Sequence, residues 1–328
     1  MNRRTTGVVL AALGIAPLTL SAQQARKLPV IGLLHPGAED SGAGPAIAMI
    51  GLRDGLRRLA YVEGETFKIE ARWARGRPEM LPELARELVR LEVDVLVAVS
   101  PVAVRAAKNA TREIPIVAHD LESEPVASGF AATLAKPGGN LTGLFLDAPS
   151  LAAKWLQLVR EVVPAAQWVG VLWDANTGES QLSAIKAAAK AMSVGVQILE
   201  FRDLNGITNA LNAKAPQRLQ ALVLLGSPLV NSNAQRIAEI VSSQKRPAIS
   251  PFRSFPEAGG MMSYGPDLPV MYRSLAPLIS KILKGAKAGD LPIEQPTHFE
   301  MVVNLKAAKA LGLTIPQTVL LRADEVIR

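Results

Sequence analysis

The chain contains no cysteine, which excludes disulfide bonds and thiolate metal sites. Aromatic residues make up only 4% of the sequence, and they are not interleaved with basic residues. The 36 lysines and arginines are dispersed, so the net charge of +7 does not indicate a nucleic-acid surface. Only three histidines occur, without the regular spacing of metal ligands. We therefore expect neither a metal site nor a nucleic-acid partner.

Enzyme motifs are also missing. The stretch KPGGN at 136–140 lacks the P-loop pattern, and the glycines between 37 and 44 lack dinucleotide-binding spacing. Gly226-Ser227 is not a nucleophile elbow. His119, Asp120 and Ser100 form the only candidate catalytic set, although adjacent strand residues such as His119 and Asp120 point in opposite directions. The sequence thus predicts no catalytic residues, no cofactor and no enzymatic activity.

The first 25 residues are typical of a secretion signal. Arg3 and Arg4 precede an apolar core at 8–20, which is too short for the roughly 20 residues that span a bilayer. Small residues allow cleavage near 22–25, and no cysteine is available there for a lipid anchor. We expect a cleaved signal peptide and a periplasmic location, with an uncleaved N-terminal anchor as the alternative.

Strand and helix patterns alternate along the remaining chain in two series. Continuous apolar runs such as 93–99 are typical of strands in parallel sheets covered on both faces. This predicts an α/β protein with two Rossmann-like, doubly wound parallel-sheet lobes. The expected strands are 30–34, 67–73, 93–99, 114–118, 168–173, 196–201, 219–225, 248–250, 260–264 and 299–303. The expected helices are 45–60, 78–91, 101–110, 151–162, 180–192, 204–213, 231–244, 268–284 and 305–311.

Two details of this assignment concern packing and turns. In the helix at 45–60, Ile47, Ile50, Leu52, Leu56 and Leu59 are expected to point inward. The run EPVASGFAATLAKPGGNLTG at 124–143 is expected to hold a further helix followed by a glycine-rich turn.

The late strand and helix after the irregular link at 291–296 suggest that the chain returns to an earlier lobe. We expect an N-terminal lobe of residues 27–121 and 251–290, and a C-terminal lobe of 122–250 and 291–328. Crossings near Leu121, Ser250 and Pro292 would form a three-crossing hinge, which restricts motion to opening and closing.

Ligands of open parallel sheets bind beyond the carboxyl ends of the strands. Ser100, at a helix start with Pro101, can hold a carboxylate, or it can simply cap the helix. Asp120 can receive an ammonium group or form a turn or salt bridge. Trp173 and Tyr264 can stack on a flat ligand or pack in the core. The predicted ligand-binding residues are His35, Ser100, Pro101, His119, Asp120, Trp173, Asp174, Asn176, Ser227 and Tyr264.

Four stretches, at 75–98, 125–143, 261–268 and 291–327, resemble the ABC-transporter substrate-binding proteins of the periplasmic-binding-protein type I fold. The similarity is to a subgroup that includes binders of aromatic amino acids. It implies a protein that captures a small molecule, favouring an amino acid or related carboxylate, and delivers it to an ABC permease with its ATPase subunit. We also expect the protein to be a monomer. A ligand-sensing domain for a membrane signalling partner, or an enzyme on the same scaffold, are the alternatives.

Overall fold

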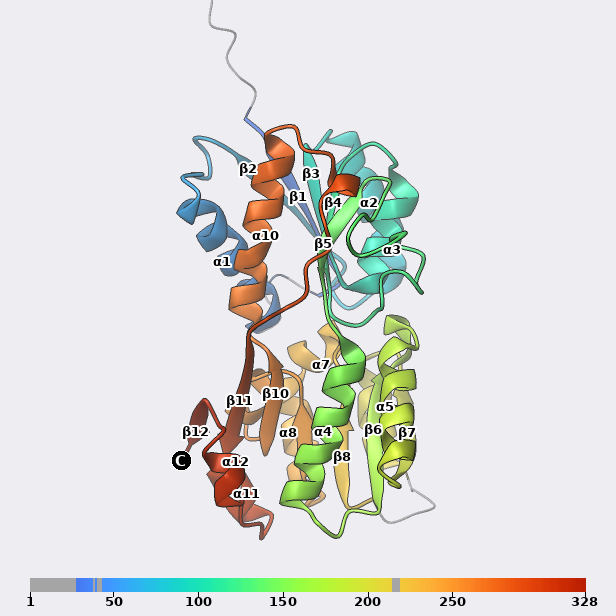
Figure 1. Ribbon diagram of the computed structural model, residues 1–328, viewed down its shortest axis with the longest axis vertical. Helices are drawn as coiled ribbons and strands as arrows, with labels where there is room; N and C mark the ends of the chain where they lie inside the picture. The colour runs from blue at the N-terminus through green and yellow to red at the C-terminus, as the bar shows by residue number, and fades with distance from the viewer. Residues whose placement is uncertain (1–27, 38, 40–42, 214–218) are drawn as a thin grey trace, which may run out of the picture.

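The computed structural model describes residues 28–37, 39, 43–213 and 219–328. The predicted signal peptide lies outside these residues. The described chain forms two lobes that follow one another along the long axis of the molecule, each a β-sheet covered by helices (Figure 1). No helix in the described ranges combines the length and the apolarity needed to cross a membrane.

The first lobe is built on a five-stranded parallel sheet with the order β2-β1-β3-β4-β5. Its strands are β1 (Val30–His35), β2 (Lys68–Trp73), β3 (Val95–Val99), β4 (Ile116–Asp120) and β5 (Leu141–Phe145). One face is covered by α1 (Ala43–Arg58) and α10 (Leu268–Leu283), and the other by the short helix η1 (Pro78–Met80), α2 (Leu81–Arg90) and α3 (Ser100–Ala110) (Figure 1). Because both faces are covered, every residue of β3 is apolar and buried.

The second lobe contains a seven-stranded sheet with the order β12-β11-β10-β9-β8-β6-β7, in which only the β10–β11 pair is antiparallel. Its strands are β6 (Trp168–Asp174), β7 (Gly195–Phe201), β8 (Ala221–Leu224), β9 (Ala248–Ser250), β10 (Met262–Pro266), β11 (Phe299–Asn304) and β12 (Glu325–Ile327). Its helices are α4 (Ala148–Val162), η2 (Ala175–Thr177), α5 (Ser180–Ala191), α6 (Leu204–Asn212), α7 (Pro228–Ser232), α8 (Ala234–Ser243), α9 (Ser254–Glu257), α11 (Leu305–Ala310) and α12 (Gln317–Leu320). A short helix η3 (Ala288–Asp290) belongs to the first lobe, beside β5.

The segment between β4 and β5 differs from the expectation, because residues 124–140 form turns and no helix. Pro125, Gly129 and Pro137 interrupt the run, and Gly129 adopts a positive φ of 70° that ends a local turn. Short-range bonds such as Phe130 N to Pro125 O (2.8 Å) satisfy part of the backbone instead. The predicted helix in this run is therefore wrong.

Strand pairing contradicts two of the predicted lobe boundaries. β5 pairs with β4, so the first lobe continues past Leu121, and β10 pairs with β9, so the chain after Ser250 is still in the second sheet. The chain crosses between lobes after β5, after β10 and along 291–298, the last of which includes the expected position Pro292 (Figure 1). We now propose that residues 28–146 and 267–290 form lobe one and that 147–266 and 291–328 form lobe two.

Helix α1 packs differently from the sequence expectation. Ile50 is 66% exposed and Leu59 is 41% exposed, so neither points inward as predicted. Gly51 instead lies against α10, where an added Cβ would be 2.6 Å from the Cβ of Tyr272. Gly55 makes a similar approach, because its Cβ would lie 2.5 Å from the carbonyl oxygen of Arg273. Because neither glycine has a side chain, α1 can approach α10 closely at these two positions.

A ligand cleft between the two lobes

Two adjoining cavities lie between the lobes, at the carboxyl ends of the parallel strands. Pro228 and Ser232 line both cavities. The first cavity is lined by Pro36, Gly37, Gly76, Pro78, Ser100, Val102, Asp174, Asn176, Thr177, Pro228, Leu229 and Ser232. The second is lined by His35, Val99, His119, Leu121, Glu122, Ser227, Pro228, Asn231, Ser232, Phe252, Leu268 and Tyr272. Both lobes therefore contribute to each cavity.

Six of the ten predicted ligand-binding residues line these cavities. They are His35, Ser100, His119, Asp174, Asn176 and Ser227. They come together because each follows or ends a strand, and parallel strands end at the same edge of a sheet. Ligand contact at each of them stays a prediction.

The other four predicted residues lie outside both cavities. Pro101 is buried in the first turn of α3. The carboxylate of Asp120 is fully buried and accepts bonds from the amides of Glu122 and Ser123 (both 3.0 Å), which is the alternative turn role. Trp173 is buried, and its indole N–H donates to Gly178 O at 3.0 Å.

Tyr264 is the fourth. Its ring stacks on Phe299 with centroids 6.2 Å apart, and the ammonium of Lys154 lies 5.8 Å from its centroid. This places its ring among residues of the second lobe, beside the hinge crossings.

Ser100 combines a strained backbone with an unpaired hydroxyl. Its φ is 74°, in the left-handed region that non-glycine residues rarely occupy, and strain of this kind is common at binding sites. Its Oγ is buried without a hydrogen-bond partner among the described residues. The α3 N-cap is Val99, and no side chain caps the helix. The alternative role of Ser100 as an N-cap is therefore not observed.

Both cleft histidines are held in the neutral form. His35 Nδ1 accepts a bond from Gly37 N (2.9 Å), which leaves the ring proton on Nε2. Burial and then the nearby His119 lower the pKa of His35 to about 3, and burial lowers the pKa of His119 to about 4. His119 Nε2 is buried without a partner within the described chain. It is thus a second polar atom left for a ligand.

The predicted set leaves out most of the lining of the second cavity, including Glu122, Asn231, Phe252 and Tyr272. Glu122 lies two residues beyond the end of β4, so a search that extends two residues past each strand end would have included it. Asn231 lies inside α7 and Tyr272 in the first half of α10, where no local signal marks a binding residue. Phe252 follows β9 and resembles an ordinary core residue.

Carboxyl groups, and no cationic side chains of the described chain, stand in the lining of the two cavities. Burial, followed by the neighbouring Asp120, raises the pKa of Glu122 well above its usual value. Burial also raises the pKa of Asp120, and it raises that of Asp174 to about 6. Among the described residues, no lysine or arginine lines either cavity. Buried carboxyls in a cavity lined by no lysine or arginine of the described ranges favour a ligand that brings its own positive charge.

The described residues contain no group of three or more histidine, aspartate or glutamate side chains placed to hold a metal ion.

Two α/β lobes joined by three crossings, with cavities between them, define a two-lobed binding protein of the periplasmic-binding-protein type I fold. The family model described as "ABC transporter substrate binding protein" matches residues 41–327, and the chain belongs to this family. This confirms the resemblance and the fold inferred from the sequence.

Named relatives agree with this assignment. A tyrosine-binding protein of Clostridioides difficile (strain R20291) is 25% identical over 267 residues, which cover 79% of this chain and 74% of that protein. A conserved domain protein from Vibrio cholerae O1 biovar El Tor has 25% identity and a TM-score of 0.84, covering 92% of this chain and all of that one. An ABC domain from Streptococcus pneumoniae in complex with L-Trp has 24% identity and a TM-score of 0.83, with the same coverage.

Proposed function

We propose that this protein captures an amino acid in the cleft between its lobes and delivers it to a membrane permease. The observation that carries the proposal is the pair of interlobe cavities, into whose walls Ser100 and His119 bring buried polar atoms without protein partners. Buried polar atoms are costly unless they are hydrogen-bonded, so a ligand that supplies the bonds is favoured. A cavity of this kind with a few convergent polar groups is typical of a small-molecule site.

The amino-acid assignment rests on two complementary kinds of polar group in the cleft. The hydroxyl of Ser100 and the first free amides of α3 suit a carboxylate, because helix starts attract anions. The carboxyls of Asp174 in the first cavity and Glu122 in the second suit an ammonium group. Two relatives are named as tyrosine-binding or carry L-Trp, which supports an aromatic amino acid.

Closure of the lobes would trap the ligand. The amide of Glu124 in lobe one donates to Ser180 Oγ in lobe two at 3.2 Å, so the lobes are in direct contact. A ligand that touches both lobes binds this closed arrangement better than an open one and shifts the population towards it. The closed form would then dock on the permease, which is driven by an ATPase subunit.

The location and the partners rest on the family and on the expected leader. We propose that the mature chain is a periplasmic monomer and that it binds its ligand without converting it. A sensing role for a membrane signalling partner would use the same cleft. Loss of uptake when the permease gene is deleted would separate transport from sensing.

The direct test is a binding screen of the purified mature chain with the common amino acids and their desamino analogues. We expect a rise in melting temperature and micromolar or tighter binding by calorimetry for one or a few amino acids, aromatic ones first. Mass spectrometry should show the ligand unchanged after incubation. If no amino acid shifts the melting temperature, the proposed ligand class is wrong.

A further inference from the structure

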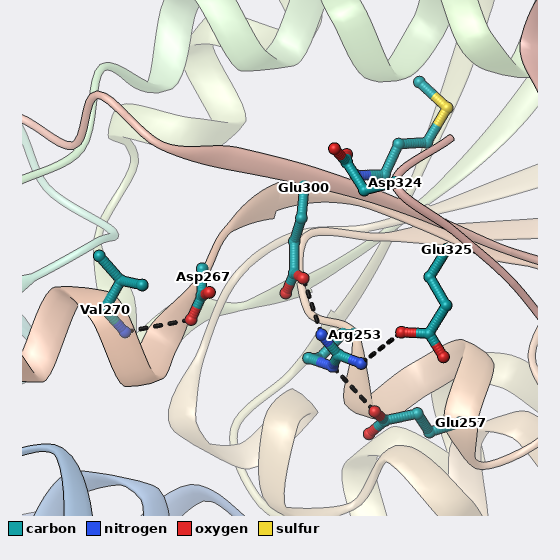
Figure 2. Close-up of polar contacts among 8 residues, drawn as sticks. Arg253, Glu257, Asp267, Val270, Glu300, Asp324 and Glu325 are labelled. Atoms are coloured by element: carbon teal, nitrogen blue, oxygen red, sulfur yellow. Dashed lines mark hydrogen bonds and ion pairs between the residues drawn. The ribbon is translucent and has the colours of Figure 1, made fainter. Parts of the chain in front are cut away.

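A single arginine is surrounded by three glutamates at the hinge side of lobe two. Arg253 Nε lies 2.8 Å from Glu257 Oε1, Nη1 lies 2.8 Å from Glu300 Oε2, and Nη2 lies 2.6 Å from Glu325 Oε2 (Figure 2). The three carboxylates belong to α9, β11 and β12. One guanidinium therefore joins a short helix to two strands, using donors that point in three directions.

The neighbours of Arg253 reach the second cavity on both sides in the sequence. Phe252 lines that cavity directly. Ser254 Oγ donates to Asn231 Oδ1 at 2.7 Å, and Asn231 also lines the cavity. The position of the turn at 250–254 therefore affects the positions of two side chains that line the cavity, Phe252 and Asn231.

The same turn is packed against the hinge strands. Glu300 is paired with Gly265 in the β10–β11 ladder, next to the second and third crossings. A Cβ added to Gly265 would lie 2.1 Å from Pro251 O, so the turn rests directly on the backbone of β10. The Glu300 side chain is only 12% exposed, and its Oε1 has no hydrogen-bond partner in the described chain. The guanidinium of Arg253 therefore compensates the charge of a largely buried carboxylate.

We propose that Arg253 is a positioning residue that fixes the turn at 250–254 against hinge strand β11 and thereby sets the shape of the ligand cavity. Without it, the turn loses its ion pairs to β11 and β12, and Phe252 and Asn231 are held less firmly. The part of this inference that concerns ligand affinity rests on the proposed function; the part that concerns the turn does not.

The matched pair of variants is Arg253→Met and Arg322→Met. Arg322 forms an ion pair with Glu161 of α4, and its side chain is about as exposed as that of Arg253. Neither Arg322 nor Glu161 lines either of the two interlobe cavities. Hydrogen exchange measured by mass spectrometry should show at least tenfold faster exchange of peptides within 248–258 in Arg253→Met alone. Affinity for L-tyrosine or L-tryptophan, whichever the unaltered protein binds, should fall about tenfold in the same variant, with Arg253→Lys in between because lysine can keep only part of the network.

The outcomes separate the two proposals. Equal exchange at 248–258 in the two methionine variants overturns the positioning role. Faster exchange with unchanged affinity overturns the coupling to the cavity. If the unaltered protein binds no amino acid, the proposed function fails, while the exchange data still decide whether Arg253 holds the turn.

Discussion

The imidazole of His119 lies flat against the ring of Tyr272, with centroids 4.1 Å apart and planes within 5° of parallel. His119 is the penultimate residue of β4, whereas Tyr272 belongs to α10, which follows the second crossing. The wall of the second cavity in lobe one is therefore made by two segments more than 140 residues apart in the sequence, and it exists only once α10 has packed against α1 and the first sheet.

Gly51 should be required for this stacking. We expect Gly51→Ala to lower the free energy of unfolding by about 1–3 kcal/mol, because its Cβ would lie 2.6 Å from Tyr272 Cβ in a close-packed contact. Ligand affinity should fall as well, since Tyr272 must move. Denaturant unfolding and calorimetry measure both. The adjacent and exposed Ile50→Ala should change the unfolding free energy by less than about 0.5 kcal/mol.

Ser100 should lower the stability of the fold slightly and raise the affinity for the ligand. Replacing it with glycine relieves the left-handed backbone at φ 74°, so Ser100→Gly should leave the protein as stable or up to about 1 kcal/mol more stable. Affinity should fall about tenfold, because a ligand hydrogen bond is lost. Ser193→Gly is the matched control, since Ser193 has φ 54° and lines neither cavity; its binding should not change. Equal affinity in the two variants would refute a ligand role for Ser100.

Glu122 should give the cleft a pH-dependent charge. A buried carboxyl with a raised pKa keeps its proton longer in the folded state than in the unfolded state, so its contribution to stability declines as pH rises above its ordinary value of 4.5. Glu122→Gln removes this decline, and the variant should gain stability over the unaltered protein as pH is raised from about 4.5 to 8. The exposed Glu65→Gln should show no such gain.

The same variant tests the ammonium site. Binding of an amino acid should strengthen with rising pH in the unaltered protein, because the ammonium favours the ionised form of Glu122. In Glu122→Gln the affinity should be about tenfold or more lower and should lose most of this pH dependence. Calorimetry at several pH values measures it, and retained affinity in the glutamine variant would exclude Glu122 as the ammonium partner.

His119 should make the fold sensitive to acid. Its pKa is about 4 in the folded protein against 6.5 ordinarily, so between these values the unfolded chain binds the extra proton and stability falls as pH falls. The shift corresponds to about 3 kcal/mol at full effect. His119→Gln should therefore lose about that much less stability between pH 6.5 and 4, whereas the exposed His298→Gln should follow the unaltered protein. Parallel pH profiles for both variants would show that His119 is not the acid-sensitive group.

Much of the architecture could be predicted from the chain. Continuous apolar runs marked β3 and β4, and alternating strand and helix patterns indicated two sheets, because burial on both faces demands such runs. The strand-end rule found His35, Ser100 and His119, which do line the cavities. The short strands β5 and β12 were missed, since β5 follows a run rich in proline and glycine and β12 has only three residues.

The sequence by itself determined where the chain alternates between buried strands and amphipathic helices, and it placed polar side chains at the strand ends, because both follow from local hydrophobic periodicity. Only the tertiary structure decided which sheet each returning segment joins and which residues face the cleft. Tyr272 and Phe252 reach the cavity through the packing of α10 and through the anchored turn at 250–254, and such long-range contacts leave no mark in a local pattern.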